Sequence, residues 1–514
     1  MRITEKTKTI AILALPILFS AFALFYNLGD RLFWGDEAET ALLGVNITTY
    51  GVPKATDGNN YITILGKGVD TNKDDVWVWR PWLDSYITAA SFTLFGKSTT
   101  SARVPFVCIA FCSVLFFAWM THRLYRKNEA TLFALLLLIT NVAFLLHARQ
   151  CRYYALLCFA QMSFIYGYHR LLRGNSKSGI FYVALALIIE FHCNYILVVP
   201  NILAMIVSTL VIHRRHMHLI RNEFMGLGVF LIFVIPWLLY AHPWHQAGYM
   251  IFDDFAVSLL YRLLQINFYI VPLILFFVPV VMHFTKRRRL IAQSQDLTAG
   301  SMNIFLWSLV PAYLLIGTIT PVLYFRYLIP LIPVFILLLI GIIVEYVRPK
   351  ALRYLFVAVL SLSNIISALS AFPILRTVSV SMPIVRFVEE ITSEYSNKLK
   401  DVVLYLRKNA HPGETLFVRD PEFPLIFYSD MRVIDARLNK LPDAHHLPDW
   451  IFAQSTSGAV DKPELQVPAG LEKNYELILL QVHDSPFSDN CPDARYHVSL
   501  TGDKFVGFKI YKKK

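Results

Sequence analysis

The sequence predicts an α-helical polytopic membrane protein with about 11 transmembrane helices and a small C-terminal α/β domain. Three observations lead to this class. The 514-residue chain is 56% hydrophobic and has a mean hydropathy of +0.49, well above the average for soluble globular proteins. Only 16% of its residues are charged, and they gather between apolar runs of about 20 residues, enough to cross a bilayer core. Residues from 382 onward are mostly polar.

Apolar runs give the predicted spans in chain order, and a long polar loop over residues 29–84 follows the first of them. The spans are expected near Thr9–Leu28, Ser101–Met120, Thr131–Leu146, Tyr154–Tyr168, Ile180–Glu190, Tyr195–Ile212, Phe224–Ala241, Asn267–Phe284, Asn303–Ile319, Tyr324–Val344 and Ala351–Ala371. We therefore expect a transmembrane domain over residues 1–381, with interfacial helices in the loop 29–84, and an extracytoplasmic α/β domain over residues 382–514.

The C-terminal stretch has the mixed pattern of a small α/β domain. Residues 384–406 and 425–428 have helical patterns. Residues 415–418, 475–482 and 505–511 are rich in the β-branched and aromatic residues typical of strands. The stretch has no recognisable catalytic motif, so we expect the chemistry to lie elsewhere.

Lys and Arg residues between the spans predict the orientation of the chain. Clusters lie near residues 123–127, 170–177, 214–221, 286–289 and 348–353. All of them face the cytoplasm if the N-terminus is cytoplasmic, as the positive-inside rule requires. The loop 29–84 and the C-terminal domain then lie outside the inner (plasma) membrane. Orientation and lipid headgroups also explain the net charge of +12, so we expect no nucleic-acid partner.

The positive-inside rule does not explain a few arginines that this orientation places on the outer side. They are Arg80, Arg149, Arg152, Arg262 and Arg326. A single arginine among interfacial aromatic residues is ordinary snorkelling. Several at one membrane face suit a phosphate or pyrophosphate group, because guanidinium binds such anions through two parallel hydrogen bonds.

An acidic stretch, Trp34-Gly35-Asp36-Glu37-Ala38, directly follows the first apolar run. Asp36 is interpreted in two ways, as the N-cap of a solvated helix or as an acid or base that acts at the lipid–water boundary. The apolar positions that follow, including Ala41, Leu42 and Val45, predict a short amphipathic helix.

The order of these motifs resembles the GT-C superfamily of membrane glycosyltransferases. The similarity is closest to the branch that holds protein O-mannosyltransferases and the bacterial lipid A aminoarabinose transferase. The resemblance rests on the acidic stretch and on Arg80-Pro81-Trp82-Leu83, Ser101-Ala102-Arg103-Val104-Pro105, His147-Ala148-Arg149-Gln150-Cys151-Arg152-Tyr153-Tyr154, Phe191-His192-Cys193-Asn194-Tyr195 and Arg326-Tyr327-Leu328-Ile329-Pro330.

The resemblance implies transfer of a hexosyl or pentosyl group from a polyprenyl-phosphate donor, of the undecaprenyl-phosphate type, to a hydroxyl acceptor. The acceptor would be a glycan, lipid or protein at the outer membrane face, as in modification of lipopolysaccharide or another cell-envelope glycan. Inversion at the anomeric carbon is expected, with Asp36 as general base and Glu37 as its orienting neighbour. The expected donor-binding residues are Arg80, Arg149, Arg152, Arg326, His147, His192 and Tyr327.

A metal requirement is left open at this stage. In some members of the family the residue that matches Asp36 also contacts a divalent cation, such as Mg²⁺ or Mn²⁺. Many relatives carry a second acid in the loop that here reads Arg152-Tyr153-Tyr154, and this chain has none there. The departure weakens the case for a two-carboxylate metal site.

Two other functions fit the same sequence. A transporter or flippase of lipid-linked sugars would share the spans and the outer arginines, although charged residues in mid-span are more typical of that class. A non-catalytic subunit of a glycan-assembly complex would fit a chain without the second acid.

Overall fold

The computed structural model describes residues 5–66, 68–212, 218–245, 254–277, 297–319, 324–372, 380–394, 396–419, 422–436, 447–456, 472–484 and 504–514. The chain divides into two compact units. One unit, here called the helical unit, comprises Met1–Tyr26, Phe106–Ile391 and His497–Ser499. The other, here called the loop–sheet unit, comprises Asn27–Pro105, Thr392–Tyr496 and Leu500–Lys514. Each unit is described by itself, and the predicted domain boundary near residue 381 stays a prediction.

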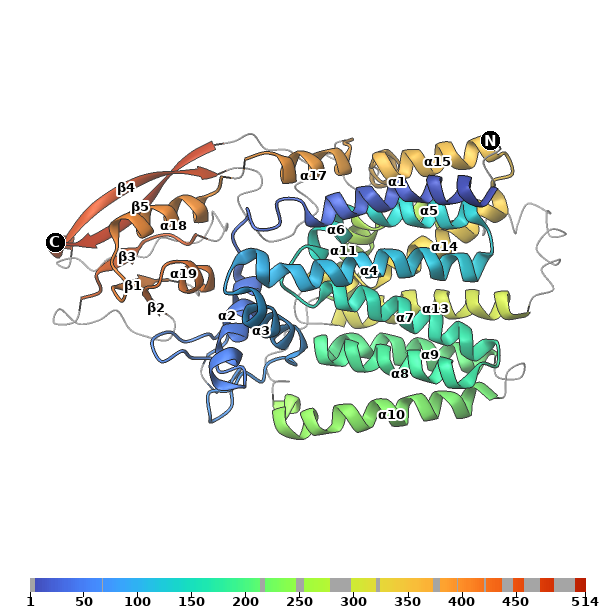
Figure 1. Ribbon diagram of the computed structural model, residues 1–514, viewed down its shortest axis with the longest axis horizontal. Helices are drawn as coiled ribbons and strands as arrows, with labels where there is room; N and C mark the ends of the chain where they lie inside the picture. The colour runs from blue at the N-terminus through green and yellow to red at the C-terminus, as the bar shows by residue number, and fades with distance from the viewer. Residues whose placement is uncertain are drawn as a thin grey trace. The chain divides into compact units, whose positions relative to one another are not determined.

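Long apolar helices make up the helical unit, and Figure 1 shows α7, α8, α9, α10 and α13 side by side. Its helices are α1 (Glu5–Phe25), most of α4 (Thr99–Tyr125), α5 (Asn128–Ile139), α6 (Val142–Ala148), α7 (Tyr154–Leu172), α8 (Ser176–Cys193), α9 (Val198–Ile212), α10 (His218–Ala241), α11 (Phe255–Tyr269), α13 (Leu297–Ile319), α14 (Leu331–Tyr346), α15 (Lys350–Leu362), α16 (Ile365–Ala371) and nearly all of α17 (Pro383–Thr392). Short 3-10 turns lie at Tyr195–Leu197, Leu273–Phe277 and Phe325–Leu328.

The predicted class of multi-pass membrane protein is confirmed. Five of the described helices are long and apolar enough to cross a membrane, or up to seven if each bent pair forms one span. The predicted number of about 11 is not confirmed. The predicted span Asn267–Phe284 begins in the last turn of α11 and continues into Leu273–Phe277, and its remainder lies outside the described residues.

Helix α11 begins at Phe255, well before the predicted span Asn267–Phe284, so the start of that span is a correction to the sequence prediction. The helix carries Arg262, Gln265 and Asn267, all of them buried. These polar side chains lower the local hydropathy, and a search for apolar runs therefore passes over the segment. Helix α3 (Leu83–Phe95) was also not predicted, because it is too short to give an apolar run of membrane-spanning length.

Small residues bring α7 and α8 into close contact. A Cβ atom added to Gly167 would lie 2.8 Å from the backbone nitrogen of Val183, and one added to Gly179 would lie 2.9 Å from that of Leu171. Such approaches are possible only for glycine, and small residues are typical of packed helices in membranes.

Asn141 makes the sharp bend of 63° between α5 and α6. Its Oδ1 accepts a hydrogen bond from the backbone N–H of Phe144 at 2.8 Å and so caps α6. Its Nδ2 donates to the carbonyl oxygen of Tyr269, at the end of α11, at 3.0 Å. One side chain therefore fixes the direction of the chain just before the predicted site residues His147, Arg149 and Arg152.

The loop–sheet unit begins with α2 (Gly35–Tyr50) packed on α3. The predicted helix after the acidic stretch is thus present. A Cβ atom on Gly44 would lie 3.1 Å from Cβ of Thr88, so the two helices are close. Most residues of α2 are buried, which shows that it packs on more than one side. Placement of this helix along the membrane surface stays a prediction.

A five-stranded sheet with the order β2-β1-β3-β5-β4 forms the rest of this unit. The strands are β1 (Thr415–Val418), β2 (Arg432–Asp435), β3 (Trp450–Phe452), β4 (Tyr475–Asp484) and β5 (Lys504–Lys513). Strand β1 is parallel to β2 and β3, with Thr415 opposite Arg432, and β5 is antiparallel to β3 and β4. The predicted strands 415–418, 475–482 and 505–511 are therefore confirmed.

Two helices accompany the sheet, α18 (Lys398–Asn409), which contacts β4, and α19 (Phe423–Tyr428), which connects β1 to β2 (Figure 1). The predicted helix 425–428 is confirmed. The predicted single helical stretch 384–406 is wrong, because it is divided into α17 and α18. Asn397 starts α18 by accepting the backbone N–H of Lys400 at 2.8 Å.

Tyr428, the last residue of α19, joins the polar loop 29–84 to the C-terminal domain inside this unit. The backbone N–H of Phe33 donates to the Tyr428 hydroxyl at 3.1 Å, and Thr99 Oγ1 lies 2.8 Å from the same oxygen. Asn60 Oδ1 accepts the backbone N–H of Val433 at 2.8 Å. The segment just before Asp36 is therefore held by residues from the far end of the chain.

Candidate active site

Asp36 is half-buried and lies in the first turn of α2, directly after Gly35. The N-cap of this helix is Trp34, and no side chain caps it. The interpretation of Asp36 as an N-cap is therefore wrong. A carboxylate in the first turn is favoured by the positive end of the helix dipole, so the helix supports a charged Asp36.

Glu37 forms a bidentate ion pair with Arg103 of α4. Arg103 Nε donates to Glu37 Oε1 at 2.8 Å and Nη2 donates to Oε2 at 2.6 Å. The Nη1 group of Arg103 also donates to the carbonyl oxygens of Leu28 and Arg31, each at 2.9 Å. Arg103 therefore ties the start of α2 to the chain that precedes it, and Glu37 is engaged in that contact.

Arg80 is buried and bridges α2 to α3. Its Nε and Nη2 donate to Glu39 Oε1 at 3.1 and 3.0 Å, and Nη2 also donates to Thr40 Oγ1 at 2.9 Å. Its Nη1 donates to Asp84 Oδ1 at 2.6 Å and to the carbonyl oxygen of Pro81 at 3.3 Å. A guanidinium has five N–H donors, and all five have protein acceptors here. The geometry favours a positioning role, and the predicted contact with the donor phosphate stays untested.

The carboxylates near Asp36 do not fit a divalent cation well. Glu37, Glu39 and Asp84 are each paired with an arginine, and an adjacent guanidinium opposes a second cation. Within the described residues, no group of three or more His, Cys, Asp or Glu side chains could hold a metal ion. The metal at Asp36 therefore stays an untested prediction.

In the helical unit, Arg149 closes the C-terminal end of α1. Its Nη1 donates to the carbonyl oxygens of Ala23 and Leu24 at 2.8 and 3.0 Å, and its Nη2 donates to that of Tyr26 at 2.7 Å. Arginine at this position satisfies the carbonyl groups that a helix end leaves open. This contact is structural, and the predicted phosphate contact of Arg149 stays untested.

Arg152 and Arg326 lie together around the buried Tyr153. The guanidinium of Arg152 lies 5.2 Å from the Tyr153 ring centroid, and that of Arg326 lies 4.0 Å from the ring of Tyr324 and 5.8 Å from that of Tyr327. Burial raises the pKa of Tyr153, while the charges of Arg326 and Arg152 oppose this rise. The charges of two predicted phosphate ligands from distant segments thus both act on Tyr153.

Neighbouring side chains hold this cluster in place. Asn194 Nδ2 donates to the Tyr153 hydroxyl at 3.4 Å. The buried His147 packs against Tyr154 and Phe325, with ring centroids 4.9 and 5.8 Å apart, and its Nδ1 lies 2.8 Å from the carbonyl oxygen of Ala143. His147 therefore connects the segments that carry Arg152 and Arg326.

His192 and Arg262 make structural contacts elsewhere in the helical unit. Nε2 of His192 lies 3.2 Å from the carbonyl oxygen of Phe233 and so links α8 to α10. Arg262 is fully buried, and it donates from Nη2 to the carbonyl oxygen of Gly317 at 2.6 Å and from Nη1 to that of Tyr324 at 2.6 Å. The latter contact fixes the residue that stacks on Arg326.

The predicted site residues thus fall into two sets. Asp36, Glu37 and Arg80 belong to the loop–sheet unit. Arg149, Arg152, Arg326, His147, His192 and Tyr327 belong to the helical unit. Within the second set, Arg152, Arg326 and Tyr327 come together. His147 packs against Phe325, the residue next to Arg326. Arg149 and His192 instead bind backbone carbonyl groups.

Comparison with known proteins now gives the fold a family context. A family model described as dolichyl-phosphate-mannose-protein mannosyltransferase matches residues 80–240. ArnT from Cupriavidus metallidurans in the apo state is similar to this chain with a TM-score of 0.59 and 14% identity, over 83% of this chain and 86% of that one. The chain therefore has the fold of this ArnT structure.

A second structure of ArnT from Cupriavidus metallidurans, bound to undecaprenyl phosphate, is similar with a TM-score of 0.55 and 13% identity, over 84% of this chain and 86% of that one. No curated protein sequence matches the chain. The match to the family model includes Arg80, Arg103, Arg149 and Arg152, and it ends before Arg326.

Sequence reasoning missed several residues of this candidate site. Arg103 stands in one of the motifs that carry the resemblance, but its ion pair with Glu37 was not predicted. Tyr153 and Asn194 likewise lie in noted motifs without an assigned role. The available signal was proximity in sequence to the outer arginines, which does apply to Tyr153.

Proposed function

We propose that the protein transfers a sugar from a polyprenyl-phosphate donor, of the undecaprenyl-phosphate type, to a hydroxyl group of an acceptor. The observation that carries this proposal is the convergence of Arg152 and Arg326 on Tyr153. Two guanidinium groups at one place suit a phosphate, because each can bind it through two hydrogen bonds. The chain is similar in fold to a protein whose structure holds undecaprenyl phosphate, and this similarity supports the same donor class.

The proposed reaction is a single displacement with inversion. The acceptor oxygen attacks the anomeric carbon, and the bond from that carbon to the phosphate oxygen breaks. The acceptor proton passes to the Asp36 carboxylate, and the polyprenyl phosphate leaves with the electron pair. General-base assistance contributes roughly 10²–10⁴-fold in rate, and preorganised cations on the leaving group contribute several kcal/mol more.

In this mechanism the remaining predicted residues hold the proposed base and the phosphate-binding segments in position. Glu37 and Arg103 fix the start of α2, and Arg80 fixes α2 against α3. Asp36 is then carried on a helix whose end is held from both sides, as a precisely placed base requires. His147 and Tyr327 similarly restrict the segments that carry Arg152 and Arg326.

The site is proposed to face the outer side of a bacterial inner membrane, with the N-terminus and the basic loops in the cytoplasm. The donor would carry a hexosyl or pentosyl group, and the acceptor would be a cell-envelope glycan, a lipid or a protein. The basis for this orientation is the positive-inside distribution of Lys and Arg.

Two measurements together test the function. Binding of tritiated undecaprenyl phosphate to the purified protein tests the donor, and mass spectrometry of envelope glycans, lipids and proteins from cells with and without the protein tests the transfer. We expect saturable binding and one added sugar mass that depends on the protein. Failure to bind tritiated undecaprenyl phosphate would overturn the proposed donor class. Unchanged masses of the glycans, lipids and proteins would favour a flippase or a non-catalytic subunit.

A further inference from the structure

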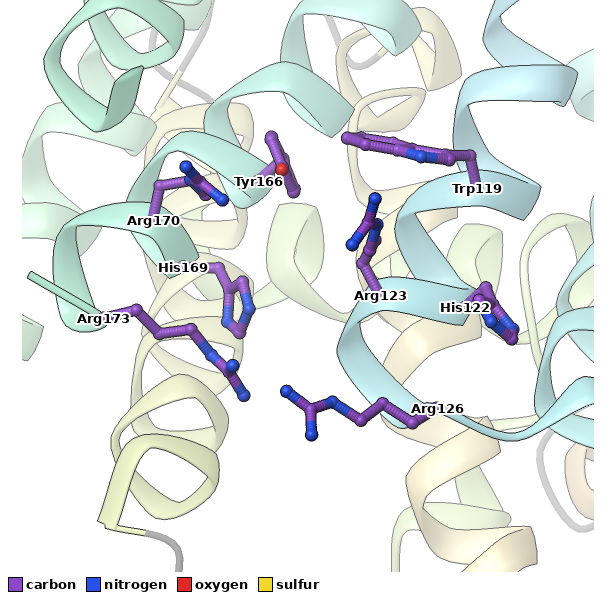
Figure 2. A pocket seen from close by; sticks show the side chains of 8 residues that line it. All are labelled: Trp119, His122, Arg123, Arg126, Tyr166, His169, Arg170 and Arg173. Carbon is purple, nitrogen blue, oxygen red and sulfur yellow. The ribbon is translucent and has the colours of Figure 1, made fainter. Parts of the chain in front are cut away.

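A cavity of about 580 Å³ opens between the ends of α4 and α7, within the helical unit, and none of its lining residues belongs to the candidate active site. Figure 2 shows the side chains that line it. They are Trp119, His122, Arg123, Arg126, Tyr166, His169, Arg170 and Arg173. Among these described lining residues there is no carboxylate, whereas four are arginines.

Aromatic rings hold two of these arginines against one wall. The rings of Trp119 and Tyr166 lie 4.8 Å apart. The guanidinium of Arg123 lies 5.6 Å from the Trp119 ring and that of Arg170 lies 6.0 Å from the Tyr166 ring. Stacking on aromatic rings orients an arginine without consuming its N–H donors, so the donors other than Arg170 Nε, which bonds Ser178, stay available to an anion.

The other two arginines reach toward each other across the opening, Arg126 from the end of α4 and Arg173 from the end of α7 (Figure 2). Arg126 has a φ of 53°, in the left-handed region that a glycine would occupy at lower cost. The backbone geometry therefore does not account for an arginine at this position.

The helix ends alone do not account for this charge. Each helix C-terminus carries about half a negative charge, and two such ends oppose about one of the four guanidinium charges. Within the described part of the chain, Arg123, Arg126, Arg170 and Arg173 form no ion pair, and Arg170 Nε donates to the neutral Ser178 Oγ at 2.9 Å. The cavity therefore has a surplus of positive charge.

We propose that this cavity binds the phosphate of an anionic membrane lipid. The cavity lies between two predicted spans, at the ends that the positive-inside rule places in the cytoplasm, where anionic headgroups meet basic pockets between helices. Trp119 and Leu115 are partly exposed on α4, at 39% and 40%, and would contact an acyl chain. A second hollow of about 470 Å³ shares Arg173 and includes Lys177, which suits a headgroup with two phosphates.

Quenching of tryptophan fluorescence by brominated lipids tests this proposal on the full-length protein in nanodiscs. The signal of Trp119 is the difference between the protein and its Trp119→Phe variant. We expect brominated phosphatidylglycerol to compete for this position at least about tenfold better than brominated phosphatidylcholine, with cardiolipin better still. The double variant R126Q/R173Q, which leaves the stacked arginines intact, should bring the ratio close to one.

The matched control is R221Q/R348Q, which removes two exposed arginines of the same predicted membrane side and should keep the ratio. Equal quenching by both lipids in the unmodified protein, or an unchanged ratio in R126Q/R173Q, would overturn the proposal. The preference for phosphatidylglycerol could also disappear when millimolar inorganic phosphate is added at constant ionic strength. That result would assign the cavity to free phosphate and overturn the proposal that it binds a lipid. Binding of undecaprenyl phosphate should be unchanged in R126Q/R173Q, so this test is independent of the proposed function.

Discussion

Arg103 and Glu37 form two parallel hydrogen bonds of 2.8 and 2.6 Å directly beside Asp36. Both side chains are almost fully buried, at 8% and 1% exposure. Loss of one partner from a buried pair leaves the other charge uncompensated and typically costs about 3–5 kcal/mol. Arg103→Ala should therefore lower the thermal unfolding temperature of the purified protein strongly.

The control for this variant is Arg386→Ala. Arg386 pairs with Glu389 at 2.8 Å on the surface, with 38% and 51% exposure, where an ion pair contributes about 0–1 kcal/mol. Unfolding followed by fluorescence-detected size exclusion compares the two variants. Equal destabilisation would contradict the structural role of the Arg103–Glu37 pair.

Arg80→Lys separates a positioning role from a phosphate contact. Lysine keeps the charge but cannot reach Glu39, Thr40 and Asp84 at once. We expect a lower unfolding temperature and an unchanged dissociation constant for undecaprenyl phosphate. A weaker dissociation constant at unchanged stability would instead place Arg80 on the donor.

Asp36→Asn removes the proposed base with a minimal change of shape. Sugar transfer should fall by about 10²–10⁴-fold, while the unfolding temperature and undecaprenyl phosphate binding remain. Asp74→Asn is the matched control, because Asp74 is an exposed acid of the same loop. Mass spectrometry of the modified acceptor gives the rates, and normal turnover of the Asp36→Asn variant would rule out Asp36 as the base.

Arg152→Gln and Arg326→Gln should each weaken binding of undecaprenyl phosphate by about 10- to 100-fold, since a hydrogen bond to a charged group contributes about 1.5–3 kcal/mol. Arg348→Gln, on an exposed arginine, serves as the charge-matched control. Scintillation proximity binding measures all three. An affinity that falls equally in the control would show a general charge effect rather than a site.

Tyr428→Phe should change the stability of the loop–sheet unit and its dependence on alkaline pH. Burial raises the pKa of Tyr428 to about 12, although Arg103 opposes the rise. An unfolded tyrosine titrates near pH 10, so the folded state binds the proton more tightly. The contribution of Tyr428 is thus constant below about pH 10 and decreases as the pH rises toward 12.

The comparison is therefore between the unmodified protein and Tyr428→Phe from pH 9 to about 12. At neutral pH the variant should lose about 1–3 kcal/mol, because the Phe33 N–H loses its acceptor. The difference should shrink above about pH 10. A difference that stays constant with pH would show that Tyr428 does not titrate in this way.

Patterns that depend on local sequence predicted much of the fold. The strand 415–418 has the bounds of β1 because a short apolar strand between turn residues is a local feature. Arg152 and Arg326 were singled out by topology alone, since they break the positive-inside rule, and they do lie together around Tyr153.

Features that depend on tertiary pairing were not predictable. Arg80 pairs with Glu39 and Arg103 pairs with Glu37. Both glutamates come from α2, and nothing in the spacing connects them to these arginines, whereas the contact of Arg80 with Asp84 is local. Helix α11 was missed because Arg262 makes it polar, and only the structure shows that Gly317 and Tyr324 accept its hydrogen bonds. Breaks such as the one at Asn141 also prevent a secure count of spans.

The hydrogen bond from Phe33 to Tyr428 joins residues 395 positions apart, and this separation has a consequence for biogenesis. Ribosomes release the chain from its N-terminal side, so the segment before Asp36 is made first and meets its partner only after Tyr428 has been translated. Closing so large a loop is slow compared with local folding. A chain interrupted before α19 would therefore carry the acidic stretch without this anchor, and maturation of the proposed active site is coupled to the synthesis of α19.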